Sequence, residues 1–317
     1  MPKTMEWSFP STNGVDTVAA AVWEPDGEPR AVLQLCHGMS EHIGRYRWLA
    51  EQMAARGFAV AGDDHLGHGK TAPSAEELGY FGPKDGYVHM MEDEHRLRQE
   101  MEKRYPGLPY FLLGHSMGSF LTRFYVSRHG EGLAGYLCCG TSGRNPLVKI
   151  AILLSGAMVR LQGGRARGTL LNALAFKDYN KRFAPVVTGH EWLSRDADAY
   201  RQYAGDPYSG FVFTNAGFRD LFRLLDTVTG RKWSGRVPKD LPIILLSGDQ
   251  DPVGDYGKGV RQVYGWLKKS GVRDLSLKLY PGARHELHNE RNREEFVEDI
   301  AAWMERRMVP GMPPAGE

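Results

Sequence analysis

The sequence predicts an α/β fold with a mostly parallel, eight-stranded sheet, helices on both faces and an inserted helical segment. Three observations lead to this prediction. Short apolar runs alternate with helical patterns along residues 31–140, as they do in βαβ units. The same alternation resumes near residue 241. Between these parts, residues 141–237 contain no strong strand pattern and are helical, aromatic-rich and punctuated by Arg and Gly.

This pattern divides the chain into four parts. Residues 1–140 are predicted to form the first part of the core, and residues 141–237 an inserted helical cap. Residues 238–309 complete the core, and the Pro- and Gly-rich residues 310–317 form a tail that we expect to be frayed. A chain of 317 residues is long enough to bury roughly three quarters of its unfolded surface.

The first part of the core begins with a predicted β-hairpin that has Asn13-Gly14 as its turn. Gly57 ends the first helix, and residues 62–71 are too rich in Gly and His to be regular structure. The predicted strands are 7–9, 15–23, 31–36, 58–61, 110–113 and 136–139, and the predicted helices are 45–56, 88–105 and 120–128. In the second part of the core, the predicted strands are 243–246 and 275–279, and the predicted helices are 256–269 and 294–307.

Composition excludes several classes of protein. The formal net charge is only +2 and the basic residues are scattered among acids, so there is no electrostatic case for nucleic-acid binding. The N-terminus lacks the apolar core of a signal peptide, and no run approaches the ~18 apolar residues of a membrane span. Cys36, Cys138 and Cys139 occupy strand positions and resemble buried apolar residues rather than a disulfide framework. We therefore predict a cytoplasmic, soluble protein.

One stretch indicates a nucleophile. The strand at 110–113 leads into Gly114-His115-Ser116-Met117-Gly118, and a helical pattern follows. This order of strand, turn and helix is the context that the nucleophile-elbow motif Gly-x-Ser-x-Gly requires. Side chains at the two glycines would collide with neighbouring backbone, and the serine is expected to be strained with its hydroxyl above the sheet edge. We predict that Ser116 is the nucleophile.

A serine hydroxyl needs a base to remove its proton and a third group to orient that base. In open α/β sheets such groups gather at the carboxyl ends of strands. An Asp-rich loop follows the strand at 243–246, and His285 follows the strand at 275–279. The resulting chain order of Ser, Asp and His is the one that α/β hydrolases use. His285 is predicted to take the proton of Ser116 and to return it to the leaving alcohol.

The acid and the base both have competitors. Asp249, Asp251 and Asp255 share one loop. We favour Asp251, because the proline after it biases its backbone toward an extended conformation that can hold a carboxylate in place. His288 lies three residues after His285, and we interpret it as a surface residue or one that lies behind the site.

The tetrahedral intermediate also needs hydrogen-bond donors for its oxyanion. One donor should be the N–H of Met117, directly after the nucleophile, and the other should come from the loop after an earlier strand. His37-Gly38-Met39 occupies that place, so the Met39 N–H is the second predicted donor. The alternative is that His-Gly is only a turn at the end of a strand.

Four motifs occur in a fixed order: residues 37–46, 64–69, 114–118 and 284–290. The series resembles the monoacylglycerol lipase and lysophospholipase group of α/β hydrolases, which is serine aminopeptidase-like, and the likeness covers about residues 31–308. The resemblance implies Ser116, Asp251 and His285 as a catalytic triad, the Met39 and Met117 amides as an oxyanion hole, and a helical cap over an acyl-binding pocket. Residues 189–196 resemble a cap segment of bacterial members. Leu66 is a departure, because an arginine is commoner there.

Polar residues near the predicted site are candidates for contacts with a glycerol-like or head group. The alternative is that these side chains pack among themselves and cap the next helix. The candidate substrate-binding residues are His37, Gly38, Glu41, Arg45 and His115.

Three other patterns are weighed and rejected. His65 and His68 suggest a metal site, but no acid or cysteine at matching spacing supports one, and we interpret their loop as structural. The run 285–288 lacks the histidine spacing of a zinc-protease helix. The run 69–71 resembles the end of a phosphate-binding loop, but Asp64 stands where that loop should open with glycine. We predict no metal and no cofactor.

Residues 147–161 form the most apolar run of the chain. They are either ordinary buried helix or a cap helix that lines an acyl tunnel or rests on a lipid surface, with Arg160, Arg165 and Arg167 facing head groups. We favour the role facing the pocket, with transient membrane contact as a further candidate. Four aromatic residues could join the same apolar wall, although such spacing is also typical of core: Phe211, Phe213, Phe218 and Phe222.

The sequence therefore predicts a serine hydrolase that cleaves carboxylic esters through an acyl-enzyme, with a monoacylglycerol or lysophospholipid as substrate. An aminopeptidase-like amide hydrolase acting on small substrates is the enzymatic alternative. A catalytically idle hydrolase fold that serves as a binding module is the other, and it is disfavoured because no triad member or elbow glycine is missing. No oligomeric state is predicted.

Overall fold

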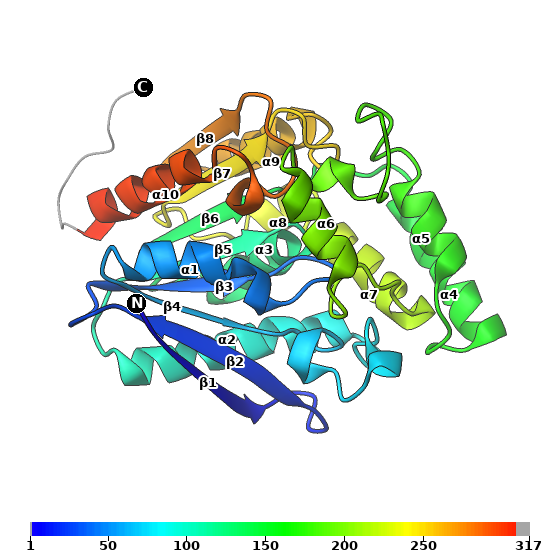
Figure 1. Ribbon diagram of the computed structural model, residues 1–317, viewed down its shortest axis with the longest axis horizontal. Helices are drawn as coiled ribbons and strands as arrows, with labels where there is room; N and C mark the ends of the chain where they lie inside the picture. Colours follow the sequence, from blue (N-terminus) through cyan, green and yellow to red (C-terminus); the bar gives the residue numbers. More distant parts are fainter. Residues whose placement is uncertain (1, 309–317) are drawn as a thin grey trace.

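Eight strands form one sheet in the computed structural model, which describes residues 2–308 (Figure 1). The strand order is β1-β2-β4-β3-β5-β6-β7-β8. The pairs β1/β2 and β2/β4 are antiparallel, and all later neighbours are parallel, which confirms the predicted α/β class. The strands are β1 (Lys3–Pro10), β2 (Thr17–Glu24), β3 (Ala31–Cys36), β4 (Phe58–Asp63), β5 (Tyr110–His115), β6 (Gly135–Cys139), β7 (Ile243–Gly248) and β8 (Leu275–Tyr280).

Helices cover both faces of the sheet. One core lies between the sheet and α1 (Arg47–Ala54) and α10 (Arg293–Met308). The other lies between the sheet and α2 (Gly86–Arg104), α3 (Met117–His129) and α9 (Lys258–Lys269). Because β3, β4, β5, β6 and β7 are buried on both faces, their sequences are near-continuous apolar runs.

Most differences from the predicted elements lie at element ends. The first hairpin strand is longer than expected, since β1 pairs with β2 along its whole length. The helix expected over 45–56 begins as a short 3₁₀ turn, η1 (Ile43–Tyr46), before α1 starts. Other 3₁₀ turns are η2 (Gly69–Thr71), η3 (Ala75–Glu77) and η5 (Leu287–Asn289). The tail expected at 310–317 lies outside the described residues. Within residues 2–308, no helix has the length and apolarity that crossing a bilayer would require.

The segment between β6 and β7 is helical, as predicted, apart from an isolated bridge between Arg167 and Thr214. We call residues 141–237 the helical segment. It holds α4 (Val148–Gln162), α5 (Thr169–Phe176), η4 (Glu191–Leu193), α6 (Ala197–Gly205), α7 (Asn215–Thr227) and α8 (Arg231–Ser234). Figure 1 shows α4 and α5 at one end of the molecule, beyond α7.

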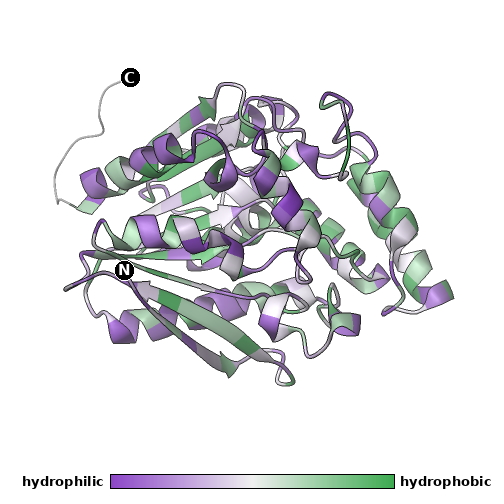
Figure 2. Cartoon of the chain, viewed as in Figure 1, coloured by the Kyte–Doolittle hydropathy of each residue, from purple (hydrophilic) through white to green (hydrophobic). Residues whose placement is uncertain are grey.

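Helices α4 and α5 present apolar side chains to solvent, and Figure 2 shows hydrophobic residues along both helices. The exposed residues include Leu147, Ile150, Leu153, Leu161, Leu170 and Leu174. The reading of 147–161 as buried helix is therefore wrong. Two of the three arginines expected to face head groups, Arg165 and Arg167, have partners within the protein. Arg165 pairs with Glu77, and Arg167 donates to the carbonyls of Leu78 and Val212, so both tie the helical segment to the η3 loop.

The four phenylalanines of the helical segment are part of the hydrophobic core, which was the alternative to an apolar pocket wall. Phe213 and Phe218 are fully buried, and Phe211 and Phe222 pack beside them. Phe213 meets Phe81 edge to face, with ring centroids 4.8 Å apart. These rings fix the base of the helical segment against the core.

Candidate active site

The predicted site residues follow neighbouring strands at one edge of the sheet. The register pairs Cys36 of β3 with Gly114 of β5, so the turn after β3 lies beside the turn that carries Ser116. On the other side, Gly248 of β7 pairs with Tyr280 of β8. Because parallel strands end at a common edge, the loops after all four strands gather there.

Ser116 occupies the strained elbow that the sequence predicts. Its φ and ψ are 55° and −121°, a conformation that non-glycine residues rarely adopt. A Cβ at Gly114 would lie 2.5 Å from the carbonyl oxygen of Gly118, and a Cβ at Gly118 would lie 2.5 Å from that of His37. Both glycines are therefore required by close approach of backbone. Ser116 itself is partly exposed while its neighbours are buried.

Among the three aspartates of the loop after β7, Asp251 alone bonds His285. Its Oδ2 lies 3.0 Å from His285 Nδ1, and its Oδ1 accepts the N–H of Val253 at 2.8 Å. Both side chains are buried. Asp249 accepts the N–H of Gly282, which makes it part of a turn, and Asp255 is exposed. The geometry therefore separates the aspartates in favour of Asp251.

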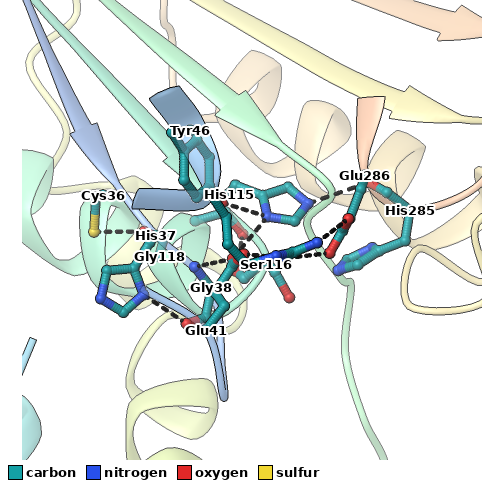
Figure 3. Close-up of polar contacts among 12 residues, drawn as sticks. Cys36, His37, Gly38, Glu41, Tyr46, His115, Ser116, Gly118, His285 and Glu286 are labelled. Carbon is teal, nitrogen blue, oxygen red and sulfur yellow. Dashed lines mark hydrogen bonds and ion pairs between the residues drawn. The ribbon is translucent and has the colours of Figure 1, made fainter. Parts of the chain in front are cut away.

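Ser116 and His285 are both held against the end of β6. The Ser116 N–H donates to the carbonyl of Cys139 at 3.0 Å, and a Cβ at Gly140 would lie 3.1 Å from His285 Cε1. His115 Nε2 also lies 3.1 Å from the His285 carbonyl oxygen (Figure 3). Among the described residues, no hydrogen bond joins Ser116 Oγ to His285, a bond that in free enzymes often tightens only with substrate.

The backbone N–H groups on either side of Met39, one of the two predicted oxyanion donors, already have hydrogen-bond acceptors. The Gly38 N–H donates to Glu41 Oε1 at 2.6 Å, and the Ser40 N–H donates to His68 Nε2 at 3.4 Å. Within residues 2–308, no acceptor bonds the N–H of Met39 or of Met117. A Cβ at Gly38 would lie 3.1 Å from Ser116 Cβ, so this turn lies directly beside the elbow.

One buried cation links the turn after β3 to the loop of His285. Arg45 Nη1 donates to Glu41 Oε2 at 2.6 Å, and Arg45 holds Glu286 through two bonds of 2.6 and 2.7 Å. Burial by itself raises the pKa of Glu286, but Arg45 lowers it to about 2. Burial likewise raises the pKa of Glu41, but His115 and Arg45 hold it well below its ordinary value. Both carboxylates are therefore ionised at neutral pH.

The five candidate substrate-binding residues are brought to the site, but Arg45 and His115 both face the Glu41 carboxylate and His37 bonds the Gly38 carbonyl. Glu41 accepts the Tyr46 hydroxyl at 2.8 Å, and that hydroxyl also lies 2.9 Å from His115 Nδ1. Burial by itself lowers the pKa of His115, but Glu41 leaves it above its ordinary value. His37, Glu41 and His115 are at most 2% exposed. The geometry favours the alternative in which this group packs among itself.

Of the two positions expected for His288, the surface is wrong and the place behind the site agrees with the structure. Its ring is buried and stacks on Tyr46 with centroids 4.3 Å apart, behind the site. Burial lowers its pKa to about 3, so the imidazole is neutral. The competing assignment of His288 as the base therefore lacks geometric support, because its ring is buried against Tyr46 whereas Asp251 bonds His285.

The helical segment contributes contacts that sequence reasoning missed. The ring of Trp192 lies 5.0 Å from that of His285, and the Leu193 carbonyl accepts the Glu286 N–H at 2.8 Å. Near the other loop, Ser40 Oγ donates to the carbonyl of Phe211 at 2.7 Å. The only available signal was the run 189–196, which holds Trp192 but says nothing about its partner.

A buried polar cluster behind the site was also missed. Cys36, His65 and Glu94 have possible ligand atoms within 4.8 Å of one another, and Asp63 Oδ2 lies 3.7 Å from His65 Nδ1. The sequence supplied no acid at metal-ligand spacing because Glu94 lies 29 residues after His65, on α2. His68 does not join the cluster, since its ring nitrogens contact Leu66 and Ser40.

Comparison with known proteins agrees with this geometry. The family model described as "Serine aminopeptidase, S33" matches residues 27–292. A monoacylglycerol lipase of Mycolicibacterium smegmatis is 28% identical over 94% of this chain and 96% of its own. The human monoglyceride lipase is 29% identical over 90% of this chain and 86% of its own. The crystal structure of a thermostable carboxyl esterase from Bacillus coagulans, in complex with glycerol, superposes with a TM-score of 0.91, 37% identity and coverage of 98% and 100%.

Proposed function

Because the chain belongs to the serine aminopeptidase S33 family of α/β hydrolases, we propose that it hydrolyses fatty-acyl monoesters through an acyl-enzyme formed at Ser116. The protein is a serine carboxylic-ester hydrolase. The observation that carries the assignment of residues is the pair of buried side chains, His285 and Asp251, 3.0 Å apart beside a strained serine.

The proposed mechanism begins with the tautomer of His285. Because Asp251 faces its Nδ1, that nitrogen carries the proton and Nε2 is free to act as base. Ser116 Oγ attacks the ester carbonyl carbon as its proton moves to Nε2. The Asp251 carboxylate then stabilises the imidazolium, and the amides of Met39 and Met117 donate to the oxyanion.

The intermediate collapses when the bond between the carbonyl carbon and the alcohol oxygen breaks. His285 returns its proton to that oxygen, the alcohol leaves, and the acyl group remains on Ser116 Oγ. A water molecule then loses a proton to His285 and attacks the same carbon. The bond between that carbon and Ser116 Oγ breaks, and His285 returns the proton to Oγ. The products are a free fatty acid and the original serine, so no cofactor is needed.

Two findings support a lipid-like ester as the substrate. Relatives that match more than 90% of this chain are named monoacylglycerol or monoglyceride lipases. The outer helices of the helical segment, α4 and α5, lie at one end of the molecule and expose apolar side chains. We propose that the helical segment is a cap over the acyl-binding site and that α4 and α5 make transient contact with lipid surfaces. We also propose a cytoplasmic location, in keeping with three buried free cysteines.

The family description favours amide hydrolysis as a second candidate function, since it names a serine aminopeptidase. An aminopeptidase needs a carboxylate that is free to bind the substrate's ammonium group. Near Ser116, Glu41 and Glu286 are both committed to Arg45. Rates on p-nitrophenyl esters of graded chain length, compared with rates on aminoacyl-nitroanilides, separate the two functions. Activity on the anilides alone would replace the ester proposal.

The nucleophile is tested by Ser116→Ala. We expect kcat to fall by roughly 10⁴-fold or more with the fold intact, because the step that forms the acyl-enzyme is lost. A fluorophosphonate probe should label the wild-type protein at Ser116 and leave the variant unlabelled. A loss of kcat below tenfold, or labelling elsewhere, would reject this nucleophile, and the absence of any adduct would favour the idle binding module.

A further inference from the structure

Two stacked histidines lie under the turn that follows β3. The rings of His37 and His65 are 3.8 Å apart and within 23° of parallel. The backbone N–H of His65 donates to His37 Nε2 at 3.1 Å. A backbone nitrogen can only donate, so His37 Nε2 is the acceptor and carries no proton. Burial and the neighbouring His65 hold the pKa of His37 well below its ordinary value, so its one proton is on Nδ1.

This tautomer fixes the peptide group that carries a predicted oxyanion donor. His37 Nδ1 lies 2.8 Å from the Gly38 carbonyl oxygen and, being protonated, donates to it. In a trans peptide the C=O and N–H point in opposite directions. Holding the Gly38 oxygen toward His37 therefore turns the Met39 N–H the opposite way. The Gly38 N–H is separately held by Glu41, so both peptides of the turn are anchored.

His65 is held in turn by two acids from different elements. Its Nε2 lies 3.1 Å from the His37 carbonyl oxygen, which can only accept, so Nε2 carries a proton. Its Nδ1 faces Glu94 Oε1 at 3.4 Å and Asp63 Oδ2 at 3.7 Å. A nitrogen between two acids is also protonated, which makes the ring an imidazolium. Burial by itself lowers the pKa of His65, but Asp63 and Glu94 raise it to about 9.

The cluster concentrates polar atoms that hydrogen bonds do not satisfy. Of the eleven buried side-chain nitrogen and oxygen atoms that lack a hydrogen-bond partner among the described residues, four belong to Asp63, His65 and Glu94. All three residues are at most 1% exposed. Buried charges without hydrogen bonds are costly unless they neutralise one another. The cluster therefore depends on the positive charge of His65.

A metal ion fits the same side chains less well. Imidazole binds a metal in the ring plane through one nitrogen lone pair. Cys36 Sγ lies 3.6 Å from Nε2, whereas Glu94 Oε1 lies 3.4 Å from Nδ1 on the opposite side of the ring. No single nitrogen of His65 faces both, and Nε2 is already directed at the His37 carbonyl. A proton on each nitrogen fits this arrangement better, because Nε2–H then donates to the His37 carbonyl and a charged Nδ1–H faces the two acids.

We propose that His65 positions the oxyanion-binding amide of Met39 through two contacts with His37. Its backbone N–H holds His37 in the tautomer that bonds the Gly38 carbonyl, and its ring, clamped between Asp63 and Glu94, holds the His37 carbonyl through Nε2–H. The proposal rests on the proposed function, since it assigns Met39 to the oxyanion. His37 and His65 are positioning residues that do not touch the substrate. Their effect appears in the transition state, because the oxyanion exists only there.

The first experiment replaces His37. His37→Phe keeps the stacked ring but loses the donor to Gly38, and His37→Asn replaces Nδ1–H with an amide N–H at a similar place. We expect kcat on a p-nitrophenyl ester to fall by about 10- to 100-fold in the Phe variant, as for a mispositioned oxyanion donor, with KM little changed. The Asn variant should retain most of kcat. A trifluoromethyl ketone, which forms an oxyanion with Ser116, should lose affinity in parallel with kcat/KM.

A second stacked pair provides the control for folding. His129 stacks on His95 with centroids 4.0 Å apart, on α2 and α3 away from Ser116. His129→Phe should leave kcat and ketone affinity unchanged. If His37→Phe and His37→Asn lose activity equally while their thermal melts match the wild type, the bond to Gly38 does not matter and the proposal is wrong.

The second experiment tests the charge on His65. The titratable groups that face this ring are Asp63, Glu94, Cys36, His37 and His68. Burial lowers the pKa of His68 to about 3 and raises that of Cys36, so neither changes charge at moderately alkaline pH. Burial and Asp63 raise the pKa of Glu94 well above its ordinary value, so the pH profile reports the His65–Glu94 pair. Wild-type kcat should fall as pH rises through about 9. Asp63→Asn should move that fall to lower pH, and His65→Gln, which keeps a donor for the His37 carbonyl, should remove it.

The outcomes separate this proposal from the proposed function. Loss of labelling at Ser116, or no ester hydrolysis by the wild type, rejects the function itself. Full ester activity together with an unchanged pH profile in Asp63→Asn and His65→Gln rejects only the clamp. Metal analysis of the purified wild type is a further check, since one equivalent of zinc that is absent from Glu94→Gln would show a metal site in place of the clamp.

Discussion

Replacing Arg45 should have a large effect on stability, because this one cation neutralises two buried carboxylates. The side chains of Arg45, Glu41 and Glu286 are 9%, 3% and 2% exposed. Arg45→Met removes the charge, keeps most of the apolar stem, and leaves two carboxylates without a partner. Removing one member of a buried ion pair costs about 3–5 kcal/mol, because the other charge stays buried.

That cost is a large part of the whole free energy of unfolding, which is about 5–15 kcal/mol for a typical protein. For a chain of this size, each kcal/mol lowers Tm by roughly 2 °C, so Arg45→Met should lower Tm by roughly 6–10 °C. Neutralising one stranded carboxylate should recover part of the loss, so Arg45→Met/Glu286→Gln should melt higher than Arg45→Met. The deficit should also shrink from pH 7 to pH 4, where the stranded carboxylates can protonate.

The chain supplies a matched control two residues away. Arg47 forms an i,i+4 pair with Glu51 at 2.8 Å, but its side chain is 70% exposed. Arg47→Met removes the same charge from a solvated pair and should leave Tm unchanged within error. Scanning calorimetry of the two variants checks the reasoning. Equal melting temperatures for Arg45→Met and Arg47→Met would show that the buried network is not a source of stability.

Two further predictions follow from packing and from titration. Gly118→Ala places a Cβ 2.5 Å from the His37 carbonyl oxygen and should reduce kcat by about 100-fold, because the turn that holds His37 is displaced. The control is Gly265→Ala in α9, where a Cβ meets no atom within 4 Å; this variant should keep kcat and slightly raise Tm. Burial lowers the pKa values of His68 and His288 to about 3, below the ordinary 6.5. As the pH falls, these histidines take up protons in the unfolded chain before they do so in the folded protein. The free energy of unfolding should therefore decrease progressively from pH 6.5 toward pH 3. Thermal melts across that range should show a smaller loss for His288→Phe.

The elements that sequence predicts well are those whose signal is local. The strand at 31–36 was predicted with the bounds that β3 has, since an apolar run ends there in a turn. The elbow was predicted from five adjacent residues and has the strained serine expected of it. Asp251 was chosen over Asp249 on the proline that follows it, and the bond to His285 agrees with that choice.

The parts that sequence could not supply depend on contacts between distant residues. Arg45 and Glu286 are 241 positions apart, and no local pattern shows that they share two hydrogen bonds. In the sequence, Glu94 has the pattern of an ordinary acid on an amphipathic helix. Only the packing of α2 against β3 buries it. The run 147–161 allows two interpretations for a related reason. Its apolar composition does not show whether another element covers the helix.

The distribution of charge around the site explains why Asp251 suits the role of orienting acid. A carboxylate beside a cation has its charge already compensated, so it stabilises a new imidazolium less. Glu286 follows His285 directly in the chain but is compensated by Arg45. Asp251 is fully buried and accepts from neutral donors, the Val253 amide and the Ser247 hydroxyl, besides His285. In the proposed mechanism its charge is therefore free to respond when His285 takes the serine proton. Arg45 keeps Glu41 and Glu286 ionised, so these acids do not compete for that proton.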